Sequence, residues 1–581
     1  METLDRPHAP PPRSSRLGTE AEAPRAPRAK TKLVGPRAFT LLWDSHSVVG
    51  IVIGLGLFVI FYAGAFALYR GELHAWADPA LRTSEVRASE ATLTMDEVVA
   101  PIFAEAPPAP GADVSVNWPM RERAFFFVRY ETAVGDTTEV VTAVVNPVTG
   151  ERVDPSRATR FSRSSLSEIL YRLHFFGQGG IWGEIVAGLI AVFLLFAVVS
   201  GVLIHLRKLP TDWHTFRPKV KLRAALADAH TVLGLVGLPF AAMYAITGAF
   251  LGLLVILLGP SVLLVFDGDY QNALDLSAGF EMPAHEPSGE PAEMLSFAEY
   301  QEALPAAWDG VVDATVMAVH GWGDANAIVQ VFGDNTPGAT SLTAGPQAVL
   351  RATTGEVLAQ NNPRLGTALG GTSAAVVNLH YARMGPGTAF AKVVYFFLAM
   401  ATASVILTGN ILWVLVRRPK DPRATPRLHR FLARLTVGVG CGLVAAIPVL
   451  FLTTRALPLD HPSLTAWENA ALFGVWAVLA ASAFAGPSAV WAARWQLAFA
   501  AVLSLLVPIA NGAMTGAWPW VSAASGWAYV LTVDLGFVLM AMALAWIASR
   551  LRPAADAPLL SGDGATTTTP VARPSLRPTS S

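Results

Sequence analysis

The sequence contains almost no cysteine and little charge. Cys441 is the only cysteine, which excludes an intramolecular disulfide and any zinc or iron–sulfur site built on several thiolates. Charged residues make up 15% of the 581 residues, hydrophobic residues make up 53%, and the mean hydropathy is +0.44. A water-soluble protein of this size rarely has such a composition, so we expect a polytopic membrane protein that contacts the lipid bilayer. The formal net charge of −1 predicts no nucleic-acid partner.

Long apolar runs divide the chain into membrane spans and polar segments. A bilayer core needs about 20 helical residues, and the first four apolar runs are long enough to cross it. Basic residues gather at 207–224 and 418–434, which places these loops in the cytosol by the positive-inside rule. Four shorter runs follow, so a total of eight spans puts both termini in the cytosol.

These runs define the expected domain boundaries. We predict a disordered cytosolic arm at 1–38, spans at 39–69, 173–206, 225–258 and 379–417, outside domains at 70–172 and 259–378, basic cytosolic loops at 207–224 and 418–434, four C-terminal spans within 435–549, and a disordered tail at 550–581. Pro239 is the only clear break in the first four spans. The four C-terminal runs carry few charges, which favours a structural or partner-binding role.

Both outside domains show the alternation typical of β-strands. Strands are predicted at 124–130, 138–145, 327–332 and 348–354. A Thr-Gly-Glu turn follows a strand in each domain, at 149–151 and at 354–356. We expect its glycine to have a positive φ, which glycine adopts at little cost.

Four histidines occupy repeat-related positions near the ends of the first four spans. His46 and His230 are each followed by glycine after four residues and by Gly-Ala-Phe after eighteen. His174 and His380 each precede an apolar run that ends in a hydroxyl residue and glycine. These matches predict a duplicated unit of helix, outside domain and helix, and hence a four-helix core.

The depths of these histidines predict two haem sites. His46 and His230 begin helices that both run outward, so they share a depth near the cytosolic face. His174 and His380 precede helices that both run inward, so they share a depth near the outer face. A haem iron with two axial histidines needs two imidazoles at one height on neighbouring helices. Structural zinc needs four clustered ligands, which these helices do not offer.

Other small residues and histidines leave alternatives open. Glycines near the cytosolic pair either give a flat ring room or allow close helix packing; they are Gly50, Gly54, Gly234 and Gly237. A single intramembrane histidine often only bonds to a neighbouring helix, so the repeat-related pairing is what favours ligation. His205 and His429 lie at cytosolic helix ends, where they are alternative inner ligands or contact lipid head groups.

As a set, these motifs resemble the PepSY-associated transmembrane family, which includes iron-regulated inner-membrane proteins and siderophore-linked ferric reductases. The resemblance covers about residues 39–420. It rests on Ser45-His46, Leu173-His174, Ala229-His230, Leu379-His380, Thr247-Gly248, Thr408-Gly409, Trp413 and the two Thr-Gly-Glu turns. Tyr62-Ala63-Gly64 and Ser200-Gly201 stand where the family has Thr-Gly.

The resemblance implies a fold and a function. The fold would be an all-α polytopic membrane protein of the bacterial inner membrane, with a duplicated four-helix haem-binding core. Two α+β periplasmic PepSY-like domains and four additional C-terminal transmembrane helices would complete it. His46, His230, His174 and His380 would ligate two bis-histidine haem b groups. Electrons would reach a periplasmic ferric siderophore, and iron would leave the chelate as Fe(II).

The sequence lacks a nucleotide-binding motif and charged residues in the centres of the first four spans, which limits the possible electron donors and functions. No strand is followed by Gly-x-Gly-x-x-Gly and a helix, and no long cytosolic domain could hold flavin or NADPH. A membrane quinol or another protein is therefore the expected donor. A transporter is disfavoured because the centres of the first four spans carry no Asp, Glu, Lys or Arg. The alternative is a non-enzymatic membrane sensor or peptidase-regulating protein, and haem content separates the two.

Overall fold

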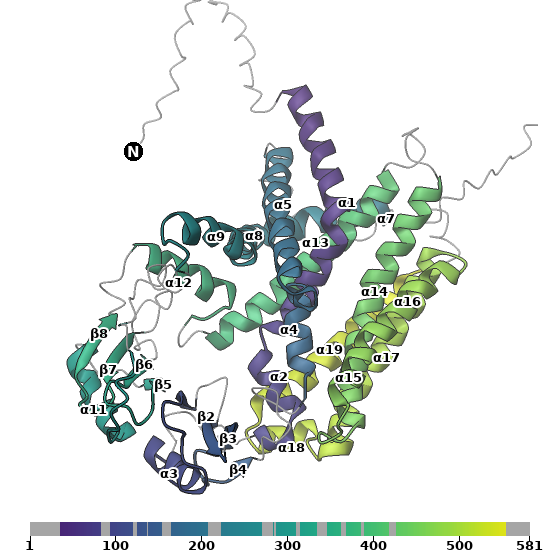
Figure 1. Ribbon diagram of the computed structural model, residues 1–581. Helices are drawn as coiled ribbons and strands as arrows, with labels where there is room; N and C mark the ends of the chain where they lie inside the picture. The colour runs from purple at the N-terminus through teal and green to yellow at the C-terminus, as the bar shows by residue number, and fades with distance from the viewer. Residues whose placement is uncertain are drawn as a thin grey trace, which may run out of the picture.

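The computed structural model describes residues 35–82, 93–119, 125–135, 137–153, 164–206, 222–269, 283, 286–308, 314–333, 346–361, 368–384, 388–416 and 426–552. The predicted arm (1–38) and tail (550–581) lie almost entirely outside these residues, as does most of the basic loop 207–224. Figure 1 shows three parts: a central helical core, an α+β part that contains all the labelled strands, and a C-terminal helical unit.

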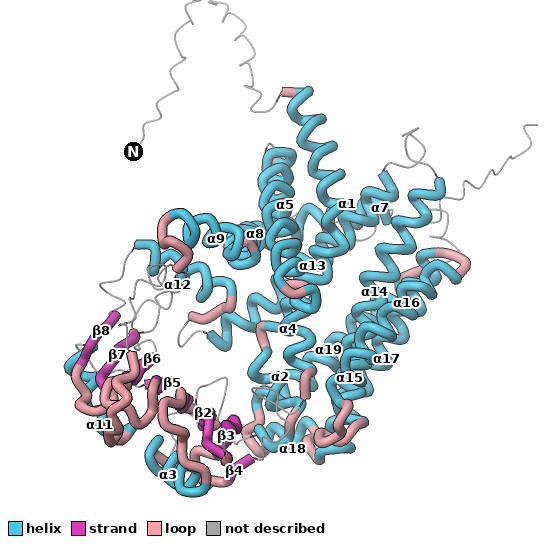
Figure 2. The backbone as a smooth tube through the Cα atoms, viewed as in Figure 1, coloured by secondary structure: helices cyan, strands magenta, loops and turns pink. Residues whose placement is uncertain are grey.

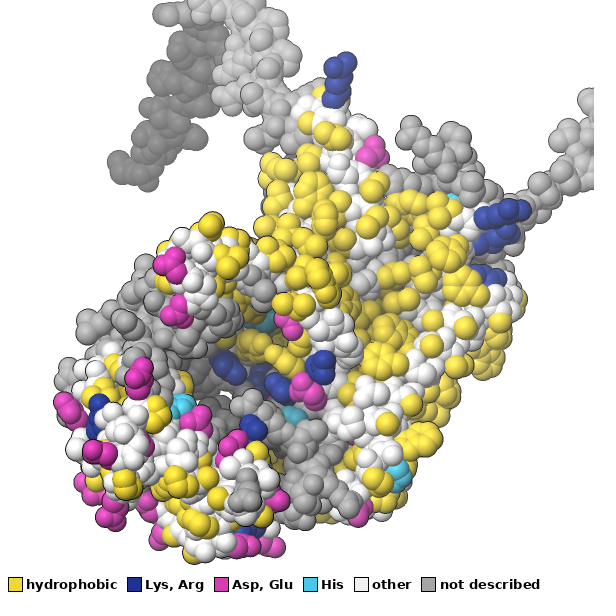
Figure 3. Space-filling model, in the orientation of Figure 1, with side chains coloured by type: hydrophobic (Ala, Val, Ile, Leu, Met, Phe, Trp, Pro, Cys, Tyr) yellow, Lys and Arg dark blue, Asp and Glu magenta, His cyan; other side chains and the backbone are white. Residues whose placement is uncertain are grey.

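The helices confirm a polytopic membrane protein. In the described part of the chain, seven helices are long and apolar enough to cross a membrane. One bent pair of helices adds an eighth span if the pair is counted as one. The first four predicted spans correspond to α1 (Pro36–Ala67), α5 (Ile181–His205), the pair α7 (Leu222–Val236) and α8 (Leu238–Gly252), and α13 (Thr388–Val416). Hydrophobic side chains cover these helices in Figure 3, whereas Asp and Glu side chains gather over the α+β part.

The third span is bent at the break that Pro239 predicted. α7 and α8 meet at an angle of 67° at Gly237. Pro239 is the second residue of α8 and has no N–H to donate to the carbonyl of Leu235, and its ring crowds that carbonyl. A further helix, α9 (Leu254–Leu264), follows after one residue. α7 and α8 therefore run in different directions. α7 carries His230 and α8 carries Thr247, and both residues belong to the candidate site.

The strands of the two outside segments join into one antiparallel sheet. Figure 2 shows them together, away from the long helices. The order is β4-β3-β2-β1-β5-β6-β7-β8. The first half contains β1 (Val114–Asn117), β2 (Phe126–Val134), β3 (Thr137–Val145) and β4 (Arg152–Val153). The second contains β5 (Ala314–His320), β6 (Ile328–Gly333), β7 (Gln347–Arg351) and β8 (Val357–Asn361).

The two halves repeat the same local structure around a shared core. Each has a helix that precedes its strands, α3 (Met95–Glu105) and α11 (Phe297–Trp308), with a Thr or Ser and a Glu closing a capping box at its start. β1 pairs with β5, which joins the halves in register, and one cluster of buried side chains spans both. Gly150 and Gly355 have φ of +70° and +73°, as the Thr-Gly-Glu pattern predicted.

Two helices of the first outside segment belong to the membrane part. α2 (Arg70–Ala77) and α4 (Leu166–His174) lie at the ends of the segment predicted as an outside domain at 70–172. Their apolar side chains, including Trp76 and Leu170, join the cluster formed by the long helices and not that of the sheet. The sheet-bearing part of this segment is therefore shorter than its predicted boundaries.

The C-terminal helices form a unit beside α1 and α13. They are α14 (Pro426–Ala456), the continuous α15, η5 and α16 (Leu464–Asn469, Ala470–Gly474 and Val475–Ala485), α17 (Ala489–Thr515), α18 (Pro519–Ala524) and α19 (Ala528–Arg550). α14 begins inside the segment predicted as a cytosolic loop at 418–434, so that loop is shorter than expected. Phe451 of this unit packs against Phe66 of α1 and Trp76 of α2, with ring centres 6.4 and 4.9 Å away.

Candidate cofactor site

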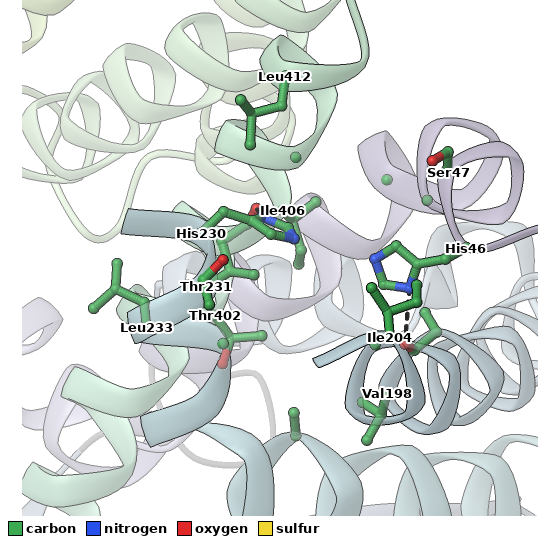
Figure 4. A pocket seen from close by; sticks show the side chains of 18 of the residues that line it. His46, Ser47, Val198, Ile204, His230, Thr231, Leu233, Thr402, Ile406 and Leu412 are labelled. Atoms are coloured by element: carbon green, nitrogen blue, oxygen red, sulfur yellow. Dashed lines mark hydrogen bonds between the residues drawn. The ribbon is translucent and has the colours of Figure 1, made fainter. Parts of the chain in front are cut away.

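The inner histidine pair lies between the first and third spans. His46 is on α1 and His230 on α7, and the centres of their imidazole rings are 6.4 Å apart, with the ring planes at 80°. Figure 4 shows the two side chains pointing toward each other from opposite walls of a cavity. The bend at Gly237 lies seven residues beyond His230, so this histidine stays on the inner segment of the bent span.

The outer pair is also close in space. His174 is the last residue of α4, and His380 is the last residue of α12 (Ala368–His380). Their ring centres are 5.9 Å apart, and the planes make an angle of 43°. The structure thus brings the four predicted histidines together as the two pairs expected from the repeat, one near each end of the four-helix core.

Each imidazole is held through Nδ1 by a neighbouring helix. Nδ1 lies 3.0 Å from the carbonyl oxygen of Ala197 for His46, 2.9 Å from that of Val405 for His230, and 2.8 Å from that of Ile60 for His174. A carbonyl oxygen only accepts, so Nδ1 carries the hydrogen in these three rings. A neutral ring then has its lone pair on Nε2, for which the described residues supply no hydrogen-bond partner.

His380 reaches the same tautomer through a hydroxyl. Its Nδ1 lies 2.9 Å from Oγ1 of Thr247, and that hydroxyl donates to the carbonyl oxygen of Met243 at 2.9 Å. A hydroxyl has a single hydrogen, so the oxygen accepts from Nδ1–H of His380. Ser200 makes a similar second contact with His46, at 3.1 Å, while donating to the backbone of its own helix.

A glycine lies against each of the four rings. A Cβ atom built on the glycine would lie 2.6 Å from the ring for Gly64 and His174, 3.0 Å for Gly409 and His230, 3.4 Å for Gly201 and His46, and 4.0 Å for Gly248 and His380. The first two distances leave no room for a side chain unless the imidazole moves. The glycine of each hydroxyl-Gly or Ala-Gly motif therefore accommodates the histidine of the opposing helix, a role that the sequence did not reveal.

A cavity of about 440 Å³ surrounds the inner pair. Its walls are mainly apolar, and they include the predicted glycines Gly50, Gly54, Gly234 and Gly237. Asn410 also lines it: this residue is only 2% exposed, and its Nδ2 has no hydrogen-bond partner among the described residues. Arg223 is the one Lys or Arg in the described lining. The cavity thus offers two imidazoles, a buried amide donor and a cation.

The two alternative inner histidines have different surroundings. His205, the last residue of α5, lines the same cavity and so remains an alternative ligand by position. His429 lies on α14 and is not among the described residues that line the cavity. It is buried against Trp413, with ring centres 5.7 Å apart and planes at 29°.

The Tyr244 side chain contacts His380 of the outer pair, and a buried ion pair joins α13 to α2. The hydroxyl of Tyr244 donates to the carbonyl oxygen of His380 at 2.9 Å, and its ring centre is 4.9 Å from that imidazole. Lys392 of α13 is buried and donates to Glu72 of α2 at 2.9 Å. This ion pair was missed in the sequence because its partners lie 320 residues apart on different elements.

The geometry suits a metal centre that takes two protein ligands. No group of three or more His, Cys, Asp or Glu residues able to hold a metal ion is found where the structure describes the chain. Two facing imidazoles of fixed tautomer can bind one metal from opposite sides, if the other ligands come from the cofactor itself. A carbonyl or hydroxyl acceptor at Nδ1 is the usual support for such a ligand.

Comparison with known proteins shows the family of the part of the chain that contains the four histidines. The family described as the PepSY-associated TM region matches residues 43–415, which include all four histidines and end before α14. An uncharacterised protein of Pseudomonas aeruginosa is 27% identical over 407 residues, which cover 98% of that protein and 68% of this chain. About a third of this chain therefore has no counterpart in that relative. The chain belongs to the PepSY-associated TM family.

Proposed function

We propose that the chain is a di-haem transmembrane electron-transfer protein that reduces a periplasmic Fe(III)-siderophore and releases Fe(II). The observation that carries the proposal is the pair of facing imidazoles, held through Nδ1 and present twice. Each pair would supply the two histidine ligands of one haem iron. The ring centres are 6.4 Å apart in the inner pair and 5.9 Å apart in the outer pair.

The inner cavity fits a haem b group in size and chemistry. Its volume of about 440 Å³ falls in the range of roughly 300–1,000 Å³ that cofactor sites occupy. His46 and His230 would hold the haem iron, and Arg223 would pair with the propionate carboxylates. Gly50 has no neighbour within 4 Å of a built Cβ, so the wall beside it leaves space for a flat ring.

The outer pair would hold the second haem b. Bound haem supplies an iron that alternates between Fe(III) and Fe(II) and so carries one electron. The protein would fix the ligands: Ile60 and Thr247 orient His174 and His380, and a hydrogen bond at Nδ1 raises the basicity of the ligating nitrogen. The Tyr244 ring beside His380 would limit the access of water and so tune the reduction potential.

The direction of transfer follows from the chemistry of the chelate. Hard oxygen ligands of a siderophore suit Fe(III), so reduction weakens the chelate and frees the metal. The chain has no nucleotide-binding fingerprint, so a membrane quinol or another protein would donate electrons at the inner pair. We place the protein in the bacterial inner membrane with both termini in the cytosol. A sensor or peptidase regulator has no need of two pairs of oriented imidazoles, which is why electron transfer is preferred.

Re-oxidation by a ferric chelate tests this function. The full chain, purified in detergent and reduced with dithionite, is mixed without oxygen with a ferric siderophore and an Fe(II) trap. We expect the reduced haem bands to disappear with trapping of one Fe(II) per haem. The gallium form of the same siderophore is the matched control, because Ga(III) cannot accept the electron. Haem that stays reduced with hydroxamate, catecholate and carboxylate chelates alike would refute the reductase function.

A further inference from the structure

Helix α4 begins against the C-terminal unit and ends at the outer histidine pair. It has nine residues, Leu166–His174, so its ends are about 13 Å apart. Its first N–H groups have no partner within the helix, and the side chain of Ser165 at the N-cap position does not cap them. Ser165 Oγ instead lies 2.7 Å from Oγ1 of Thr465, a residue of α15.

Glu468 of α15 supplies the missing cap. Its Oε2 accepts from the backbone N–H of Ser165 at 2.8 Å, and its Oε1 accepts from the hydroxyl of Ser164 at 2.5 Å. Ser164 Oγ in turn accepts from the N–H of Leu166 at 3.1 Å, so both N–H groups are satisfied. Thr454 Oγ1 lies 2.8 Å from Oε1, and Glu468 has no exposed surface. A carboxylate at a helix N-terminus is stabilising through both hydrogen bonds and the helix dipole.

The helix that carries Glu468 departs from regular geometry beside it. Residues Ala470–Gly474 form a π-helical turn between α15 and α16. Such a turn inserts an extra residue, which rotates the preceding side chains relative to those that follow, and it is frequently found at functional sites. Here it sets the direction of the segment that holds Thr465 and Glu468 against α4.

A second buried contact anchors the neighbouring helix α2. Asp534 of α19, which has no exposed surface, accepts from Trp76 Nε1 at 2.8 Å and from Asn511 Nδ2 at 2.8 Å. Arg455 of α14 donates to the carbonyl oxygen of Ala77 at 2.9 Å. α2 is tied to α4 through Ser167, whose hydroxyl donates to the carbonyl oxygen of Arg70 at 2.9 Å. The C-terminal unit therefore fixes α4, which carries His174, and the neighbouring helix α2.

We infer that Glu468 is a positioning residue for the outer histidine pair. It caps α4 from the C-terminal unit, and α4 presents His174 opposite His380. The expected effect on the outer haem rests on the proposed function. The capping of α4 by Glu468 does not. It also assigns a role to helices outside the matched range of 43–415: they hold the outer ligand in place.

The test compares Glu468→Ala and Glu468→Gln with Gln496→Ala in the full-length protein. Gln496 is the matched control because it is buried in the same unit but bonds to Leu479 and Ser482, away from α4. Hydrogen exchange over residues 164–174 is measured first, because it needs no haem. We expect exchange about five- to tenfold faster in Glu468→Ala, as for a lost helix cap, a smaller change in Glu468→Gln, and none in Gln496→Ala.

The redox readout is the reduction potential and the low-spin signal of the outer haem, assigned with a His380→Ala variant. We expect both to change in Glu468→Ala while those of the inner haem stay constant. Unchanged exchange at 164–174, or equal changes at both haems, would overturn the inference. A wild-type protein without haem would refute the proposed function instead, and the exchange comparison would still decide whether Glu468 holds α4.

Discussion

The inner and outer histidine pairs share one construction but differ in their surroundings. In both, a ring is anchored through Nδ1 and packed on a glycine of the opposing helix. The inner rings stand at 80° beside an apolar cavity, whereas the outer rings stand at 43°, with the Tyr244 side chain against His380. The inner histidines lie within long helices; the outer ones end the short helices α4 and α12.

This difference indicates a division of roles between the two sites. A histidine inside a membrane span is fixed by the span itself, so the inner pair depends mainly on the four-helix core. A histidine at the end of a short helix depends on the contacts that hold that helix, so the position of His174 depends on α4 and on the C-terminal unit. The predictions below separate the sites on this basis, in order of decreasing effect.

Removing a ligand should abolish one site and spare the other. His174→Ala and His380→Ala should each lose the outer haem and keep the inner one, and His46→Ala and His230→Ala should do the reverse. Haem quantified per chain with the pyridine haemochrome assay, on protein shown to be folded by size exclusion, checks this. Loss of both haems, or of neither, in a folded variant would contradict the pairing.

Adding a side chain at a ring-contacting glycine should displace the histidine. A Cβ on Gly64 would lie 2.6 Å from Nδ1 of His174, so Gly64→Val should lose most of the outer haem, with the inner one retained. Gly536→Val on α19 is the matched control, since nothing lies within 4 Å of a Cβ built there and it does not line the cavity. The reduced spectrum of each variant provides the measurement. Full outer haem in Gly64→Val would show that the contact does not restrict His174.

Removing the Thr247 hydroxyl, which accepts from His380, should shift the reduction potential of the outer haem without loss of that haem. Thr247→Val leaves Nδ1 without an acceptor, which lowers the basicity of the ligand and favours Fe(II). The loss of a hydrogen bond worth about 1 kcal/mol corresponds to a rise in the reduction potential of the outer haem on the order of tens of millivolts. Ser404→Ala removes a comparable hydroxyl that bonds only to its own helix. A spectroscopic titration should show the shift in the outer haem alone; an equal shift in both would argue against a local cause.

The smallest effect is expected from acid on the outside sheet. The N–H groups of Ser288, Asn326 and Gly289 hold the pKa of Asp324 at about 2, below its ordinary value. A lowered pKa in the folded state stabilises the fold above about pH 4, and this is lost as the pH falls through about 2. Thermal unfolding between pH 7 and pH 2 should show this loss in the wild type and not in Asp324→Asn. Both haems should survive the substitution at pH 7.

Much of the fold follows from local patterns in the sequence. The long apolar runs predicted α1, α5 and α13, because a membrane span needs an unbroken apolar stretch, although the predicted second and fourth spans begin 8 and 9 residues before α5 and α13. Alternation and the Thr-Gly-Glu turns predicted strands in both outside segments. The joining of these strands into one sheet was not predictable, because pairing of β1 with β5 is a contact between distant segments.

The sequence predicted the four histidines of the site. It did not predict the groups that accept hydrogen bonds from their Nδ1 atoms. The repeat identified four residues of one type at matched positions, and these are the rings that the fold brings together in pairs. Their acceptors are mostly backbone carbonyls, such as Val405 and Ile60, which have no sequence signature. The role of Glu468 was hidden for a similar reason, since its partner Ser165 lies 303 residues away.

The most direct test of the account is the haem content and spectrum of the purified full-length protein. The protein is expressed with added haem, oxidised in air and then reduced with dithionite. The account predicts two haem groups per polypeptide, with the low-spin spectrum of six-coordinate bis-histidine haem b in both states. A folded protein that carries no haem would contradict the central claim and favour a binding or regulatory role for the outside sheet.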